Sequence, residues 1–167
     1  CDWSSDVCSS DLHFCSEATR ELYVRLPEEA GYPPHMVGKL LRSMYGCRDA
    51  GLNWERCVAK AMKHLGFQQG KSSPCVYYHP ERGIRSVVHG DDFTSIGRKV
   101  DVDWLHASLG KEWSVTIRGV LGPPGYPDTQ TSIVILNRIV TWHECGITWE
   151  SDPRHVDLIV RTLLPAS

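Results

Sequence analysis

Two adjacent carboxylates, Asp91 and Asp92, follow Gly90 between two runs of hydrophobic, β-forming residues. Strands on either side would place both acids at the tip of a hairpin, where like charges repel. A turn needs only one Asp or Asn beside Gly, so the second acid is unfavourable for stability alone. A divalent cation removes the conflict, because carboxylates hold the Mg²⁺ ions that assist phosphoryl and nucleotidyl transfer. For the tripeptide taken alone, an ordinary solvated Gly-Asp turn is the simpler interpretation.

The residues around the two acids predict the elements that position them. Residues 84–89 and 93–96 read as the two strands of the hairpin, and residues 75–79 read as a third strand. The tetrapeptide PERG at 80–83 joins residues 75–79 to residues 84–89 as a hairpin turn.

A helix is predicted over residues 50–65, with Asp49 as its N-cap and Gly66 as its left-handed C′ residue. Its apolar residues recur at the spacing of one helical face: Trp54, Val58, Ala61 and Leu65. Because Trp54 falls on this stripe, we expect it in the core rather than as a base-stacking platform. The basic edge of the same helix, at Lys60, Lys63 and His64, is interpreted as a solvated face rather than a template contact.

The rest of the chain predicts a mixture of strands and helices. Strands are expected over 20–26, 113–117, 133–142 and 147–150, helices over 36–45, 99–109 and 153–163, and loops over 28–34 and 119–131. Asp152 and Pro153 form the start signal of the last helix, whose apolar face comprises Val156, Ile159, Val160 and Leu163. Hairpins that are segregated from helices indicate an α+β fold rather than a doubly wound sheet.

Composition excludes several classes of protein. The 167 residues carry a net charge of −2 and are 41% hydrophobic and 23% charged, which fits a globular core and argues against a histone-like protein. No apolar run approaches the length of a membrane span, so no membrane partner is expected. The seven cysteines lack zinc-finger spacing, and their odd number and scatter indicate free thiols in a reducing compartment, the cytoplasm or nucleus. Walker A, G-x-G-x-x-G, G-x-S-x-G and H-E-x-x-H motifs do not occur.

The first twelve residues, CDWSSDVCSSDL, have neither a helical period nor a strand alternation. With one allowed codon choice they back-translate into the sequence of a sequencing-library adapter. We therefore expect residues 1–12 to be a disordered artefact and exclude them from the fold. Without the three aspartates of this segment, the remaining 155 residues carry 18 basic and 17 acidic side chains, a net charge of +1.

A longer set of motifs surrounds the acidic turn. It comprises residues 39–54 (KLLRSMYGCRDAGLNW), Gly66-Phe67, residues 75–78 (CVYY), residues 22–29 (LYVRLPEE) and Gly90-Asp91-Asp92. In this combination and order the chain resembles the reverse transcriptase domain of copia-type retrotransposon Pol polyproteins. The resemblance covers residues 13–163 and is strongest over 20–97.

The resemblance implies a right-hand polymerase palm, in which an antiparallel sheet carries the GDD hairpin and helices pack against it. Asp91 matches the carboxylate that binds the catalytic Mg²⁺ or Mn²⁺, and Asp92 matches its neighbour. The segment Tyr45, Gly46, Arg48 and Asp49 matches the motif that lies along the incoming nucleotide and template. The implied partners of the parent protein are an RNA template, a DNA primer and deoxynucleoside triphosphates.

Three departures from the family pattern bear on activity. His89-Gly90 replaces Tyr-x before the two aspartates, and Asp49 stands where the family usually has Gln. The third departure concerns the family's other catalytic Asp, which lies about five residues before a Phe that His13 or Phe14 marks here. That position is Cys8 or Ser9, inside the adapter-like segment. Residues 13–167 are therefore expected to be a partial palm, truncated at both ends and without that Asp.

These observations predict a fragment of an RNA-directed DNA polymerase whose parent is a two-metal nucleotidyltransferase and which is inactive by itself. One pair of carboxylates should bind Mg²⁺ weakly and align no reacting groups. Two alternatives stay open. The GDD tripeptide is also the signature of viral RNA-dependent RNA polymerases, and a decayed, non-catalytic remnant would at most bind nucleic acid.

Overall fold

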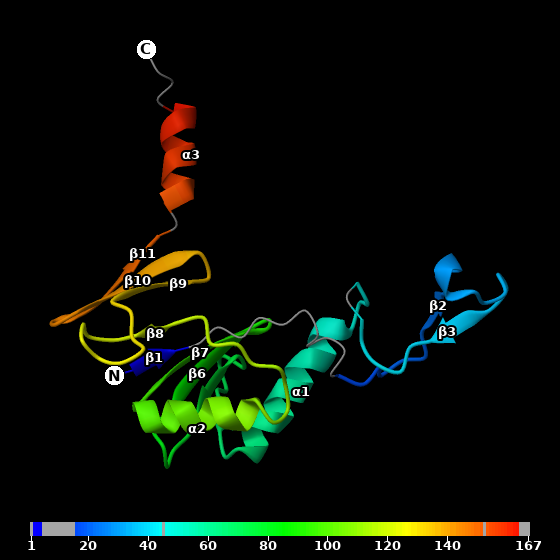
Figure 1. Cartoon of the computed structure of the whole chain (residues 1–167), viewed down its shortest axis with the longest axis horizontal. Helices are drawn as coiled ribbons and strands as arrows, with labels where there is room; N and C mark the ends of the chain where they lie inside the picture. The colour runs from blue at the N-terminus through cyan, green and yellow to red at the C-terminus, as the bar shows by residue number, and fades with distance from the viewer. Residues whose placement is uncertain (1, 5–15, 45, 152, 164–167) are drawn as a thin grey trace.

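The computed structural model describes residues 2–4, 16–44, 46–151 and 153–163. Within these residues, helices and antiparallel strands form an α+β arrangement. The strands form a six-stranded, a three-stranded and a two-stranded sheet. Figure 1 shows two helices beside the largest sheet, the two-stranded hairpin extending away from this body, and the C-terminal helix following the last strand of the three-stranded sheet.

The six-stranded sheet carries the acidic turn. Its strands follow the order β4 (Gln68–Gln69), β5 (Val76–Tyr78), β6 (Arg85–His89), β7 (Asp92–Gly97), β1 (Asp2–Ser4) and β8 (Val120–Leu121), and all neighbouring strands are antiparallel. The predicted hairpins of residues 75–79, 84–89 and 93–96 are thereby confirmed. The expected disorder of residues 1–12 is wrong for Asp2–Ser4, because these residues pair with β7 and β8.

Helices α1 (Ala50–His64) and α2 (Lys99–Leu109) pack on one face of this sheet, and both predicted helices are confirmed. The core between them contains Trp54, Val58, Met62, Phe67, Tyr77, Ile84, Phe93, Leu105, Leu109 and Trp113. Ala61 and Leu65 of the predicted stripe are only partly buried against this core, whereas Met62 is fully buried. The buried face of α1 is thus rotated from the predicted one.

Gly66 ends α1 as predicted. Its φ is +93°, and a Cβ there would lie 3.1 Å from Nε2 of His79, so both the backbone angle and the space favour glycine. The amide of Phe67 donates to the carbonyl of Met62, which satisfies a carbonyl at the end of the helix.

The predicted helix over residues 36–45 is wrong. Val37–Lys39 form strand β3, which pairs with β2 (Tyr23–Arg25), the shorter form of the strand predicted over 20–26. Its apolar residues Met36, Val37 and Leu41 are exposed, so no core face selects a helix there. Between the strands, residues 28–34 contain the short 3-10 helix Glu28–Ala30.

Two further strand predictions differ from the structure. Residues 113–117 form no strand, although Trp113 is buried in the core and Val115 packs against it. The run 133–142 is interrupted by a turn at Leu136 and Asn137, both with positive φ, and becomes β9 (Ser132–Ile135) and β10 (Arg138–His143). Trp113 and Val115, like Ile133 and Ile135, are more buried than the residue between them, but a strand also needs a neighbour and an uninterrupted backbone.

The C-terminal part consists of a small sheet and a helix. The sheet has the order β11 (Gly146–Glu150), β10, β9, and its β10–β11 hairpin confirms the predicted turn at residues 144–146. Leu121 of β8, in the region predicted as a loop, forms a second small core with Ile135 and Val140. Helix α3 (Pro153–Leu163) confirms the last predicted helix, while its predicted cap Asp152 lies outside the described residues.

Candidate functional site

The two acids lie on a tight turn that joins β6 to β7. His89 pairs with Asp92 in the ladder, so Gly90 and Asp91 are the two central residues of the turn. Gly90 has a φ of +62°, and the two-residue turn with glycine at its first central position is one of the favoured hairpin turns. The turn therefore follows from local sequence, and it brings Asp91 and Asp92 together as predicted.

Helix α1 holds this turn through Trp54. The indole Nε1 of Trp54 donates a hydrogen bond of 2.6 Å to the carbonyl oxygen of Gly90. The ring is 2% exposed and makes an edge-to-face contact with Trp113, at 5.1 Å between centroids. The core position expected for Trp54 is confirmed. Its hydrogen bond to the turn was missed by sequence reasoning, although a buried Trp usually finds an acceptor for its N–H.

Asp92 has an unusual environment for a carboxylate. Its side chain is 20% exposed, and its Oδ1 is buried without a hydrogen-bond partner within the described part of the chain. Nη2 of Arg118 lies 3.7 Å from this oxygen. Burial raises the pKa of Asp92, Arg118 opposes this shift, and Asp91 adds to it. Arg118 lies between the strand predicted over 113–117 and the loop predicted over 119–131, and no sequence motif pointed to it.

Asp92 lies on the sheet face that the helices do not cover. Side chains alternate along a strand, so Phe93 faces α1 and α2, whereas Asp92 and Thr94 face the other way. The register places Val87 of β6 and Val76 of β5 on the same face as Thr94, and both are exposed. The partly buried Asp92 carboxylate thus lies on the sheet face opposite the helices rather than in the core between them and the sheet.

The other predicted site residues precede α1 and are placed differently. Tyr45 lies outside the described residues, while Gly46, with φ of +86°, and Arg48 are exposed. Asp49 is bound by Arg20, with Nη2–Oδ1 at 2.8 Å and Nε–Oδ2 at 3.1 Å, and also accepts from Thr19. The Asp49 carboxylate therefore forms an ion pair with Arg20 of the same chain.

The ion pair with Arg20 lowers the pKa of Asp49 and leaves its side chain without a hydrogen bond to the first amides of α1. The Arg20 guanidinium holds the pKa of the Asp49 carboxyl well below its usual range. Asp49 occupies the N-cap position of α1, but its side chain makes no capping hydrogen bond. The predicted side-chain cap is wrong, because a charged partner binds the carboxylate instead of the helix amides.

The acidic turn fits a hard divalent cation in its chemistry but supplies only part of a coordination shell. Carboxylate oxygens are the ligands that Mg²⁺ prefers, and the unpartnered Oδ1 of Asp92 is such an oxygen. In the described ranges, no group of three or more His, Cys, Asp or Glu side chains lies so as to hold a metal ion. Asp91 and Asp92 are thus candidate ligands that require further oxygen ligands from elsewhere.

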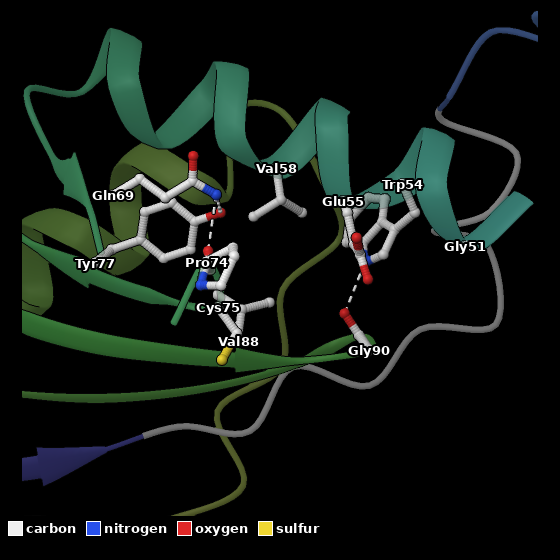
Figure 2. Close-up of a pocket in the computed structure, with 10 residues that line it drawn as sticks. All are labelled: Gly51, Trp54, Glu55, Val58, Gln69, Pro74, Cys75, Tyr77, Val88 and Gly90. Atoms are coloured by element: carbon white, nitrogen blue, oxygen red, sulfur yellow. Dashed lines mark hydrogen bonds between the residues drawn. The ribbon is translucent and has the colours of Figure 1, made fainter. Parts of the chain in front are cut away.

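A pocket of about 320 Å³ adjoins the turn on the helix side of the sheet. Figure 2 shows it between α1 and the sheet, with Trp54, Glu55 and Gly90 at one end and Gln69 and Tyr77 at the other. Sequence reasoning did not find this pocket, because its walls come from segments whose spacing depends on the packing of α1.

Among the described residues, no helix is long and apolar enough to cross a membrane.

A stretch of 98 residues, 56% of the chain, is 31% identical to the retrovirus-related Pol polyprotein from transposon TNT 1-94 of Nicotiana tabacum. The matched stretch spans 7% of the length of that polyprotein. No protein-family model matches the chain, and no solved structure matches it. The similarity supports derivation of this chain from a retrotransposon Pol polyprotein.

Proposed function

We propose that this chain is part of the palm of a copia-type reverse transcriptase, in which Asp91 and Asp92 are the metal-binding carboxylates. The similarity to a retrotransposon Pol polyprotein supports the origin of the chain. The observation that carries the function is the acidic turn. It is held by Trp54 and includes a buried Asp92 oxygen that has no hydrogen-bond partner among the described residues.

In the parent protein the reaction is the template-directed addition of a deoxynucleotide to a primer 3′-OH. A bound Mg²⁺ would supply the positive charge that stabilises the reacting phosphate. Asp91 and Asp92 would hold that ion, and the Trp54 hydrogen bond fixes the backbone of the turn that presents them. Arg118 reduces the repulsion between the two acids by placing a guanidinium near Asp92.

The segment before α1 supports binding rather than chemistry. Arg48 is exposed and free of ion pairs with described residues, so its guanidinium is accessible to a phosphate of the template or nucleotide. Asp49 cannot serve as a base-edge contact while both of its oxygens are bound by Arg20. We propose that Arg48, with Gly46 beside it, contributes to the template contact and that Asp49 instead anchors the segment.

Metal binding tests the proposal directly. We expect Mn²⁺ to bind the chain weakly in electron paramagnetic resonance titrations, and we expect D91N and D92N each to remove this binding. D103N is the matched control, because Asp103 is an exposed acid of α2 that pairs with Lys99. Mn²⁺ binding that is unchanged in both D91N and D92N would contradict the proposed metal site.

Primer extension tests whether this chain has polymerase activity and separates a reverse transcriptase from an RNA-dependent RNA polymerase or a non-catalytic remnant. On a primed RNA template with Mg²⁺ or Mn²⁺, we expect no synthesis by this chain, because two carboxylates on one turn cannot align an in-line attack. Template-dependent synthesis that D91N abolishes would overturn the expected inactivity while supporting a polymerase. A preference for ribonucleotides would instead favour an RNA-dependent RNA polymerase, and nucleic-acid binding without metal binding would favour a non-catalytic remnant.

A further inference from the structure

The pocket beside the acidic turn has the size and lining of a small-molecule site. Its volume of about 320 Å³ lies at the lower end of the range of ligand pockets. Val58 of α1 and Val88 of β6 form its apolar middle, and the aromatic side chains of Trp54 and Tyr77 lie toward its two ends (Figure 2). Narrow apolar walls with aromatic rings favour a flat aromatic occupant.

The polar groups of the pocket define the charge of that occupant. Glu55 extends from α1 beside Trp54 (Figure 2). Among the described residues that line this pocket, its carboxylate is the only formally charged group. At the other end, the Gln69 amide donates to the carbonyl of Pro74 and, at 3.4 Å, to the hydroxyl of Tyr77. Burial raises the pKa of Tyr77, so the phenol is neutral and can donate its own hydrogen.

We propose that this pocket binds a flat aromatic molecule that carries a protonated amine or amidine. The cationic group would pair with the Glu55 carboxylate, and the ring would lie between Val58 and Val88. An anion of the same shape is disfavoured because it would meet the negative charge of Glu55, and the described lining residues include no cation to compensate it. The proposal is independent of metal binding or polymerase activity at Asp91 and Asp92.

The indole of Trp54 offers a site-specific signal for the experiment. It lines the pocket, and Trp149 of β11 is 53% exposed and lies in a different sheet. In ¹⁵N-labelled protein, the two indole N–H resonances can be assigned from the signals that disappear in W54F and W149F. The probes are 2-naphthamidine and 2-naphthoate, which share a ring and differ in the sign of their charge.

We expect 2-naphthamidine to shift the Trp54 indole resonance saturably, while Trp149 stays unchanged and 2-naphthoate shifts neither. E55Q should weaken 2-naphthamidine binding about tenfold, as for the loss of one charge-assisted hydrogen bond. E144Q removes an equal charge from an exposed turn and should leave the affinity unchanged.

A second variant blocks the space rather than the charge. Gly51 lines the pocket, and a Cβ built there meets nothing within 4 Å, so G51F adds a ring over the pocket without a clash at its first atom. We expect G51F to abolish the shift of the Trp54 resonance. The proposal is overturned if both probes shift Trp54 equally, if Trp149 responds like Trp54, or if 2-naphthamidine shifts neither resonance at its solubility limit.

Discussion

Helices α1 and α3 carry the same kind of apolar pattern and have opposite surroundings. In α1, Trp54, Val58 and Met62 are at most 2% exposed, because the sheet and α2 cover them. In α3, Val156, Ile159, Val160 and Leu163 are 48–71% exposed. Helical spacing therefore predicts that a helix forms and which residues share a face, whereas burial depends on a partner surface that the spacing does not encode.

The same valine-to-alanine substitution in α1 and in α3 should give the largest difference in the free energy of unfolding. V58A removes two buried methyl groups from the core and should lower the free energy of unfolding by about 2 kcal/mol. V160A removes the same groups from an exposed face and should change it by less than about 0.5 kcal/mol. Urea unfolding followed by far-UV circular dichroism measures both. An equal loss in the two variants would show that α3 is covered in solution.

The two indoles at Trp54 and Trp149 provide a second matched pair. W54F keeps an aromatic ring in the core but removes the donor to the Gly90 carbonyl, and it should cost about 1 kcal/mol. W149F alters an exposed ring on β11 and should cost less than about 0.5 kcal/mol. The same unfolding experiment checks both values. If W54F were neutral, the hydrogen bond from α1 would not be holding the acidic turn.

The ion pair that joins Arg20 to Asp49 should have the smallest effect, because Arg20 is half exposed and salt screens the pair. The pKa of Asp49 is lowered in the folded state, so the pair contributes stability above the ordinary carboxyl pKa of 3.8. This contribution is lost as the pH falls below that value toward the folded-state pKa.

We therefore expect D49N to be less stable than the unmodified chain at pH 6 and to approach it in stability below pH 3.8. Urea unfolding at a series of pH values measures the difference. R20Q should reproduce the effect, and the double variant R20Q/D49N should add little, because each change removes the same interaction. A difference that is constant at every pH would rule out the ion pair as its cause.

Local signals predicted the central body of the molecule well. The helices at 50–65 and 99–109 and the hairpins of residues 75–96 have start, stop and turn residues at the expected places, and the structure confirms them. Asp91 and Asp92 could be placed on one turn for the same reason. Gly90 adopts the positive φ of +62° that the turn requires without steric cost.

The remaining features depend on contacts between distant segments. Residues 37–39 have helical spacing but pair with β2, and the strand predicted at 113–117 has no neighbour in the described structure. The turn at Leu136 and Asn137 had one local signal, since Asn tolerates positive φ. The partners of Trp54, Asp92 and Asp49 come from segments far along the chain, and no periodicity within one segment reveals them.

Strand β11 lies at the edge of its three-stranded sheet and affects how the protein behaves at high concentration. In the described three-stranded sheet, β11 pairs only with β10, and all five of its residues, including Ile147 and Trp149, are exposed. The backbone amides and carbonyls on its other side are available for pairing with an extended strand of another molecule. Aggregation should therefore increase as protein concentration rises, and T148K would oppose such edge-to-edge pairing.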